Sequence, residues 1–362
     1  MSVAAAARAD ASPARAPVGT LERLPKWLNL VPMVVQWLWL SLRHGSLTLP
    51  SAANPALTCG GMVGDGKLEY FDIMGARAKA VTAPYTFVDN EGVASIGAAL
   101  AAIHDAKLVF PLIAKPNLGW CGFGVRLLRD SEDLRRYLIH SPSGERIVLQ
   151  QFVPDEGEAG LYYVRPPGAE RGRIVGILLR SFPRVVGDGR RSIAELMAAD
   201  ERLRRLGRDG LSEPCCDTAR VPNAGEVVRV ATIGSTRVGG LYQDGSGLVT
   251  DALSAAIDDI ARDMTDFHIG RFDVRFSSLP SLRNGEEFTI IEVNGAGAEA
   301  VQAWDPALTL REAYAIVFAK QRLLFELGSA MRRNGHKPAR LIELGRHFFR
   351  QQRLIRAYPP SN

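Results

Sequence analysis

Short apolar runs separated by glycine-containing turns dominate the middle of the chain. Residues 107–114 (KLVFPLIA) and 122–128 (GFGVRLL) have the length and composition of two neighbouring strands. The segment that follows predicts a short helix capped by Ser131, with Leu134, Tyr137 and Leu138 on one face. This pattern predicts two strands joined by a turn and followed by a helix with one apolar face.

A second pair of strands is predicted between residues 270 and 294. In 270–276 (GRFDVRF) apolar and charged residues alternate, so the aromatic residues and Val274 share one face and Arg271, Asp273 and Arg275 the other. A polar loop with Asn284 and Gly285, a pair typical of hairpin turns, leads into the apolar run 288–293. We therefore expect an antiparallel pair.

Residues 27–42 are uncharged and mostly apolar, and they contain three of the five tryptophans of the chain. A membrane-spanning helix needs about 20 apolar residues, so this segment is too short to span. We expect a helix that packs on the body of the protein. The alternative is a helix at a membrane surface, because tryptophans between basic residues suit that environment.

Residues 340–356 form a second amphipathic pattern, in which Leu341, Leu344, Phe348 and Ile355 recur near helical spacing among five arginines. We expect this basic helix to pack its apolar stripe on the protein. Binding to a membrane or to acidic partners is the alternative.

Composition narrows the functional classes only slightly. The chain has 362 residues, 46% of them hydrophobic, and a net charge of +5. Its four cysteines form no CxxC pair, which argues against a zinc site or a disulfide framework and makes a reducing cytoplasm the expected location. No recognised nucleic-acid-binding module is found, so we expect no nucleic-acid partner.

Lys115 ends the first apolar run and is followed by a turn containing Gly119, Gly122 and Gly124. Glycines allow backbone N–H groups to approach phosphate oxygens, and a lysine at the base of the turn adds a positive charge. The pattern predicts a phosphate-binding loop. An ordinary β-turn beside an exposed lysine is the alternative, and neither a Walker motif nor a dinucleotide fingerprint occurs.

Asp273 and Glu292 lie on the two predicted neighbouring strands, and Asn294 is on the same side as Glu292. Two carboxylates and an amide oxygen are hard ligands that Mg²⁺ prefers. The alternative is a cross-strand salt-bridge surface with the adjacent arginines. Together with the phosphate-binding loop, the three residues predict a magnesium–nucleotide site.

From Lys79 to Gly297 these motifs resemble the ATP-grasp ligases, in particular D-alanine–D-alanine ligases and the ATP-grasp domain of cyanophycin synthetase. Arg180 and the GDG and SIAEL segments at 187–196 are similar to the cyanophycin synthetase pattern. The resemblance implies an α+β ATP-grasp fold, in which two lobes with antiparallel sheets grip ATP. Here a short, atypical region replaces the usual N-terminal domain.

The resemblance also implies roles for individual residues. Arg271 and Arg180 would be catalytic, Glu158 would bind the ribose with Glu156 as its competitor, and Asp273, Glu292 and Asn294 would hold two Mg²⁺ ions, with Mn²⁺ as an alternative. The remaining residues expected to bind ATP are Lys79, Lys115, Gly119, Gly122, Gly124, Gln150, Gln151, Phe152 and Val153.

The implied reaction is ATP-dependent ligation of a carboxylate to an amine through an acyl-phosphate, with both substrates small molecules. A kinase acting on a small-molecule or lipid-linked hydroxyl is the alternative. A non-catalytic scaffold is disfavoured because both metal carboxylates are present. The residues after Asn294 differ from those of the D-alanine ligases, so the resemblance does not identify the substrates of this protein. A homo-oligomer is possible.

The sequence predicts six regions along the chain. These are a disordered N-terminus (1–20), a tryptophan-rich hydrophobic segment (21–56), a reduced region before the ATP-grasp lobes (57–105), a small lobe with the glycine-rich lid (106–155), a large lobe with the metal site (156–325) and a basic C-terminal helix (326–362).

Overall fold

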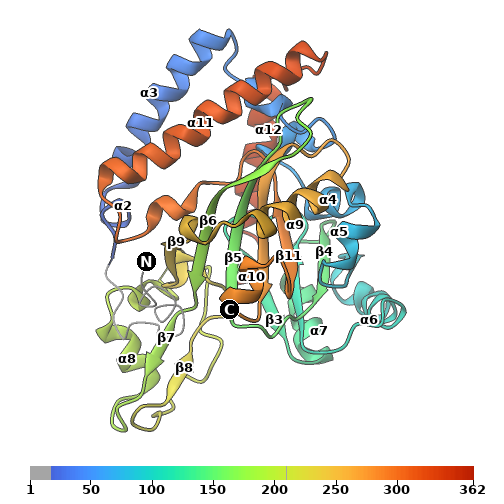
Figure 1. Cartoon of the computed structure of the whole chain (residues 1–362). Helices are drawn as coiled ribbons and strands as arrows, with labels where there is room; N and C mark the ends of the chain where they lie inside the picture. The colour runs from blue at the N-terminus through green and yellow to red at the C-terminus, as the bar shows by residue number, and fades with distance from the viewer. Residues whose placement is uncertain (1–17, 209) are drawn as a thin grey trace.

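A computed structural model describes residues 18–208 and 210–362 (Figure 1). The small lobe contains a four-stranded antiparallel sheet in the order β1-β4-β2-β3. Helices α6 and α7 pack against it, and their apolar side chains form one core with those of the strands. The elements are β1 (Tyr85–Asp89), α6 (Ile96–Asp105), β2 (Leu112–Pro116), β3 (Arg126–Leu128), α7 (Ser131–His140) and β4 (Arg146–Gln151).

Two details of the small lobe differ from the sequence prediction. The strand predicted over residues 107–114 begins only at Leu112. Helix α7 is capped by Asp130, whose side chain accepts hydrogen bonds from the backbone of Glu132 and Asp133, and not by Ser131. An ionised carboxylate at this position also faces the positive end of the helix dipole. The predicted apolar face of the helix is confirmed, because its three members are buried.

The large lobe is built on a five-stranded antiparallel sheet in the order β11-β10-β5-β6-β9. The main core lies between one face of this sheet and helices α4, α5 and α9. The elements are α4 (Lys67–Ile73), α5 (Ala76–Ala80), β5 (Gly157–Val164), β6 (Arg173–Ser181), β9 (Leu241–Asp244), α9 (Asp251–Arg262), β10 (Ile269–Phe276), α10 (Leu279–Arg283) and β11 (Phe288–Asn294). The antiparallel sheets confirm the predicted fold class.

Strands β10 and β11 pair as predicted, with Asp273 opposite Glu292. Their connection is not a two-residue turn, because helix α10 forms within it and Asn284 caps the C-terminal end of that helix. Every residue of β10 is buried. Its apolar face lies in the main core, and its charged face is directed at the other lobe. The alternating pattern therefore places the apolar side chains in the core and the charged side chains on the opposite face of the sheet.

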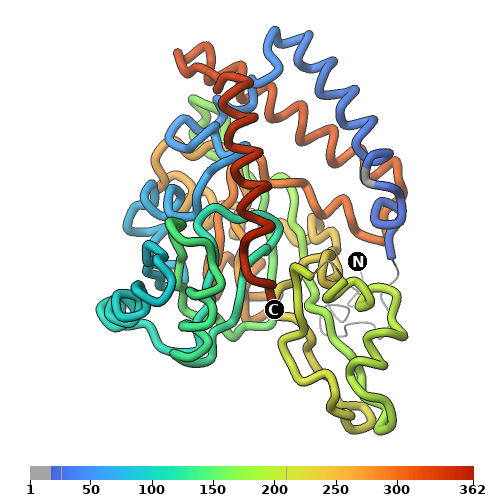
Figure 2. The backbone as a smooth tube through the Cα atoms, turned by 180° about the vertical axis from the view of Figure 1, so that it is seen from behind, coloured from blue at the N-terminus to red at the C-terminus, as the bar shows by residue number. Residues whose placement is uncertain are grey.

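The described chain also contains a smaller unit, the helix α12 and several short 3₁₀ helices. Strands β7 (Arg184–Val186) and β8 (Val227–Arg229) pair beside α8 (Ile193–Ala199). Helix α12 (Leu341–Ile355) runs down the back of the molecule, past both lobes (Figure 2). The short 3₁₀ helices are η1 (Leu49–Ala52), η2 (Thr58–Gly61), η3 (Gly92–Ser95), η4 (Leu203–Arg205), η5 (Thr236–Val238), η6 (Ser246–Leu248) and η7 (Val301–Trp304).

The hydrophobic segment near the N-terminus forms α3 (Lys26–His44), which follows the short α2 (Thr20–Arg23) and packs along α11 (Leu310–Arg333). The expected packing holds for one face only. Leu40 is buried, and Trp37 meets Phe325 edge to face, whereas the opposite face of α3 is exposed. In the described parts of the chain, no helix is long and apolar enough to cross a membrane.

Both ends of the described chain depart from the predicted regions. The disordered segment predicted at 1–20 lies outside the described residues as far as residue 17, but Val18 is buried. The predicted boundary at residue 326 falls inside α11. The basic helix α12 buries Leu354 and Ile355 but leaves Leu341 and Phe348 exposed, so its predicted apolar stripe is only partly packed.

Candidate functional site

A cleft of about 360 Å³ lies between the two sheets. Strands β2 and β4 of the small lobe form one wall, and β5, β6, β10 and β11 of the large lobe form the other. The segment before α4, the glycine-rich loop and α12 border it. Charged side chains from distant parts of the sequence meet here: Lys67, Lys115, Glu158, Arg180, Arg271, Asp273, Arg275, Glu292 and Glu299.

Lys115 is buried at the end of β2, on the wall of the small lobe. Its Nζ donates to Gln150 Oε1 at 2.7 Å and to the backbone oxygen of Ile291 at 2.9 Å, so it bridges the two lobes. Burial lowers the pKa of Lys115 to about 8, although Glu292 opposes the shift. A buried lysine with a lowered pKa favours the arrival of a compensating anion.

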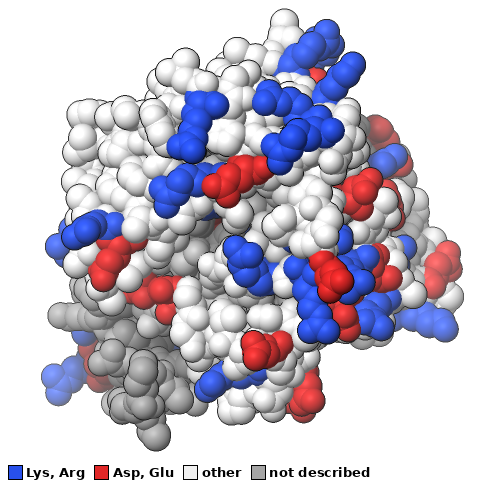
Figure 3. All heavy atoms as spheres, turned by 45° about the horizontal axis from the view of Figure 1, so that its top comes forward, with Lys and Arg blue, Asp and Glu red and all other residues white. Residues whose placement is uncertain are grey.

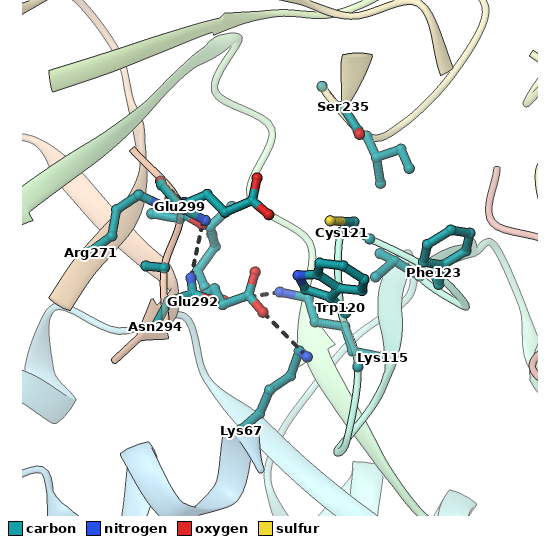
Figure 4. Close-up of a pocket in the computed structure, with 18 of the residues that line it drawn as sticks. Lys67, Lys115, Trp120, Cys121, Phe123, Ser235, Arg271, Glu292, Asn294 and Glu299 are labelled. Carbon is teal, nitrogen blue, oxygen red and sulfur yellow. Dashed lines mark hydrogen bonds and ion pairs between the residues drawn. The ribbon is translucent and has the colours of Figure 1, made fainter. Parts of the chain in front are cut away.

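Lys67, which sequence reasoning missed, is a second cation in this cleft. It begins α4, and its Nζ lies 3.2 Å from Glu292 Oε1, as Figure 4 shows. Lys79, predicted to bind the nucleotide, is exposed on α5 and does not line the cleft. The role of Lys79 in nucleotide binding stays a prediction, and Lys67 is the lysine that lies in the cleft. The Gly-Asp-Gly segment immediately before Lys67 is the local signal that could have drawn attention to it.

The predicted metal ligands meet on β10 and β11. Asp273 is opposite Glu292, and Asn294 Nδ2 donates to Asp273 Oδ2 at 3.2 Å. Arg271 contacts both oxygens of Asp273, with Nε at 2.7 Å and Nη2 at 3.0 Å. The Glu292 side chain is 31% exposed and faces the cleft. The oxygen atoms that could bind a metal ion therefore lie close together, but both oxygens of Asp273 are hydrogen-bonded to Arg271.

Arg180 on β6 joins two buried carboxylates. Its Nη1 lies 2.8 Å from Glu158 Oε1, and its Nη2 lies 3.4 Å from Asp273. Arg275 Nε holds the other Glu158 oxygen at 3.2 Å. Burial alone raises the pKa of Glu158, but Arg275 and Arg180 outweigh it and hold the pKa below its usual value.

The same balance applies to Asp273, where burial raises the pKa and the guanidinium groups of Arg180 and Arg271 lower it further than burial raises it. Both carboxylates are therefore ionised at neutral pH. The role of Glu158 in ribose binding stays a prediction, because its two oxygens are held by arginines in this structure.

The glycine-rich loop forms one side of the cleft. Gly122 and Gly124 have φ values of +74° and +72°, which favour glycine. A Cβ on Gly124 would lie 2.7 Å from Pro116 Cγ, so this glycine shapes the loop and does not line the cleft. Gly119 and Gly122 do line it, with Trp120 and Phe123 beside them (Figure 4).

The C-terminal part of the chain holds this loop. Gln351 Nε2 donates to the backbone oxygen of Gly119 at 3.0 Å, and the Tyr358 hydroxyl donates to that of Leu118 at 2.9 Å. Across the cleft, Gly122 lies close to Ile233 of the large lobe. The loop therefore lies over the cleft, where it can exclude water.

The segment 150–153, which is predicted to bind ATP, also reaches the cleft, since Gln150, Gln151, Phe152 and Val153 line it. The side chains of both glutamines form hydrogen bonds with the backbone of the protein. Gln150 Nε2 donates to Ala83 O at 3.2 Å, and Gln151 Oε1 accepts from the Val109 backbone at 3.0 Å. A ligand at this strand would therefore meet mainly its backbone.

Glu299 and Tyr162 extend the site beyond the residues that the sequence singled out. Arg271 Nη1 donates to the Tyr162 hydroxyl at 3.2 Å and to the Glu299 backbone oxygen at 3.3 Å. Tyr162 also hydrogen-bonds to that same oxygen. These contacts fix Arg271 next to the segment that follows β11, where the sequence departs from that of the D-alanine ligases.

No protein-family model matches the chain, and the search of curated proteins gave no match. Similar solved structures include a bifunctional glutathione synthetase from Pasteurella multocida, at 17% identity and a TM-score of 0.35. The match covers 72% of this chain but only 36% of that one.

A D-alanine–D-alanine ligase from Bacillus anthracis matches at 13% identity over 78% of this chain and 71% of that chain, with a TM-score of 0.42. An N5-carboxyaminoimidazole ribonucleotide synthetase in complex with ADP matches at 15% identity over 67% and 46%, with a TM-score of 0.36. These scores are low and support no inference about substrate or reaction. Two antiparallel sheets with a cleft between them are the arrangement that was predicted from the sequence motifs.

Proposed function

We propose that this protein is an ATP- and Mg²⁺-dependent ligase that joins a carboxylate to an amine through an acyl-phosphate. The observation that carries the proposal is the meeting of Asp273, Glu292 and Asn294 with Lys115 and Lys67 in one cleft, beside a glycine-rich loop. Oxygen ligands on one side and lysines on the other suit a magnesium–triphosphate group.

The residues present fit magnesium, provided that the arginine contacts of Asp273 give way to the metal ion. Glu292 faces the cleft and can bind a metal ion directly, and Asn294 offers an amide oxygen beside it. The oxygens of Asp273 become available only when Arg271 and Arg180 move away from them. A metal ion held by these residues would neutralise phosphate charge. Once released from Asp273, Nε and Nη2 of Arg271 would be available to the phosphoryl group, while Nη1 keeps its contacts with Tyr162 and the Glu299 backbone.

In the proposed reaction, a carboxylate oxygen of the first substrate attacks the γ-phosphorus, and the bond between this phosphorus and the bridging oxygen breaks to release ADP. The amine then attacks the acyl carbon, loses a proton and displaces phosphate. Lys115 and Lys67 hold phosphate oxygens, and Arg271 stabilises the charge that develops during transfer. The loop carrying Trp120 shields the acyl-phosphate from water.

Hydroxylamine distinguishes this reaction from its alternatives, because it converts an acyl-phosphate into a stable hydroxamate. We expect ADP release with ATP, Mg²⁺ and a member of a carboxylic-acid panel, and a hydroxamate of that acid when hydroxylamine is added. ADP release with a phosphorylated hydroxyl product and no hydroxamate would identify a kinase. Failure to bind ATP at all would refute both.

Substitution of Lys67 and Lys79 tests which lysine contacts the nucleotide. Lys67→Met is expected to weaken ATP binding by about tenfold or more, because it removes a charge-assisted contact to phosphate. Lys79→Met is the matched control and should leave binding unchanged, since Lys79 lies outside the cleft. Isothermal titration calorimetry with ATP and Mg²⁺ measures both. The opposite order would restore the prediction made from sequence.

Lys115→Met is expected to weaken ATP binding by about tenfold or more and to change the free energy of unfolding by less than about 1 kcal/mol. Loss of the two hydrogen bonds of Lys115 is offset by relief from burying its charge. Because the folded pKa of about 8 lies below the ordinary lysine pKa of 10.5, this burial cost is present below pH 8 and disappears as the pH rises toward 10.5.

The same pKa predicts a pH dependence of nucleotide binding. In the wild-type protein, the affinity for ATP should fall as the pH rises through about 8, where Lys115 loses its proton. The Lys115→Met variant should lack this step. An identical pH profile in both proteins would show that Lys115 does not bind phosphate as a cation.

A further inference from the structure

Helix α3 is amphipathic in the reverse sense of an ordinary surface helix, because its polar side chains point inward. Asn29 Nδ2 donates to Leu21 O at 2.7 Å, and Gln36 Nε2 donates to Phe318 O of α11 at 2.8 Å. Ser41 Oγ is bonded to Trp37 O at 2.7 Å within the helix. The inner face of α3 is therefore fixed to the protein by polar contacts as well as by apolar packing.

The outer face of α3 is entirely apolar between residues 27 and 42. Each position described as exposed in this range carries a large apolar side chain, and Trp27 and Leu42 are 67% and 84% exposed. A continuous face of this kind differs from the single exposed apolar residues that are common on protein surfaces. Its members are Trp27, Leu28, Leu30, Val31, Val34, Val35, Leu38, Trp39 and Leu42.

Positive charge borders this apolar face. The guanidinium of Arg43 lies 5.4 Å from the centre of the Trp39 ring, and Arg332 Nη2 donates to the backbone oxygen of His44 at the end of α3. Residues 327–362 contain eight lysines and arginines but one acidic residue, Glu343. Figure 3 shows a broad uncharged surface at the top of the molecule, with lysine and arginine side chains along its border.

We propose that the outer face of α3 binds the surface of a lipid bilayer that contains anionic lipids. Because the inner face of α3 is held on α11, the helix can enter the bilayer only by lying in its interfacial plane. The indole rings of Trp27 and Trp39, near the two ends of the face, suit the headgroup region. The bordering arginines match the negative headgroups. The start of α12, a helix that exposes Leu341 and Ile342 in its first turn, lies at the same end of the molecule as α3 (Figure 2).

Co-sedimentation of the full chain with vesicles tests the proposal without reference to catalysis. We expect the protein to pellet with phosphatidylcholine vesicles containing about one-third phosphatidylglycerol at low salt, and to bind pure phosphatidylcholine less well. The triple variant Leu38→Gln, Trp39→Gln, Leu42→Gln should partition at least about tenfold more weakly. Arg43→Gln should weaken binding to the anionic vesicles by up to about fivefold.

The matched control replaces apolar side chains of the small lobe, which are also exposed: Val93→Gln, Leu100→Gln, Val109→Gln. It should pellet like the wild type, and circular dichroism should show that all variants are folded. Wild-type protein that stays in solution with anionic vesicles would overturn the proposal. So would a triple variant that still pellets fully, or a dimer that this variant disrupts while no protein binds vesicles, since the face would then serve self-association.

Discussion

Glu292→Gln is expected to reduce the rate of ADP release by about a hundredfold or more, the scale on which loss of one transition-state contact acts in other enzymes. Glutamine keeps the shape of the side chain but loses the negative charge that a magnesium ion requires. Of the two carboxylates, Glu292 is the one that faces the cleft without arginine on its oxygens in this structure. The measurement is ADP release at saturating ATP and Mg²⁺.

Glu287→Gln, at the start of the same hairpin strand, provides the matched control. Glu287 accepts hydrogen bonds from Ser277 and Ser281 and does not line the cleft. We expect its turnover to equal that of the wild type. If the Glu292 variant turned over ATP at the wild-type rate while remaining folded, the metal site would have to be sought elsewhere.

Arg180→Met is expected to lower the free energy of unfolding by about 3 kcal/mol, because it removes one partner from two buried carboxylates. Arg180 bridges Glu158 and Asp273, whose side chains are 6% and 1% exposed. Each keeps one arginine, Arg275 or Arg271, which limits the loss. Urea unfolding at pH 7 measures the change.

Arg184→Met is the control for this variant, since Arg184 pairs with a Glu156 side chain that is 63% exposed. A pair so exposed typically contributes no more than about 1 kcal/mol. Equal losses from both substitutions would show that the buried network has no special role in stability.

The same network predicts acid sensitivity. Because the pKa values of Glu158 and Asp273 are lower in the folded protein, their contribution is fully present above the ordinary values of 4.5 and 3.8. It is lost as the pH falls further, when the folded carboxylates take up protons. We expect wild-type stability to fall below about pH 4.5 and Arg180→Met to show a smaller fall, as measured by urea unfolding across this range.

The chemistry of the cleft could be predicted where it depends on strand periodicity. Alternation along 270–276 separates Phe272 and Val274 from Asp273, and antiparallel pairing then brings Asp273 opposite Glu292. The glycine-rich turn after Lys115 is equally local, because positive φ angles at Gly122 and Gly124 are a property of that segment. The strand alternation and the glycine-rich turn depend on residues close together in the chain, so they can be predicted from the sequence.

Contacts between distant segments could not be predicted in this way. Lys67 and Lys79 are both lysines beside short helices, and only the packing of α4 and α5 on the large sheet places the first in the cleft and the second in solvent. The arginines that hold Glu158 and Asp273 likewise come from two strands, β6 and β10. No local sequence pattern predicts the order of these strands in the sheet.

The sequence by itself determined that residues 27–42 form an apolar helix and that Asp273, Glu292 and Asn294 share a site. Only the tertiary structure decided which face of α3 is exposed and which groups occupy Asp273. The physical reason is that both outcomes depend on partners far along the chain. Phe318 receives the hydrogen bond of Gln36, and Arg180 reaches the carboxylate of Asp273, only after the helices and strands have packed.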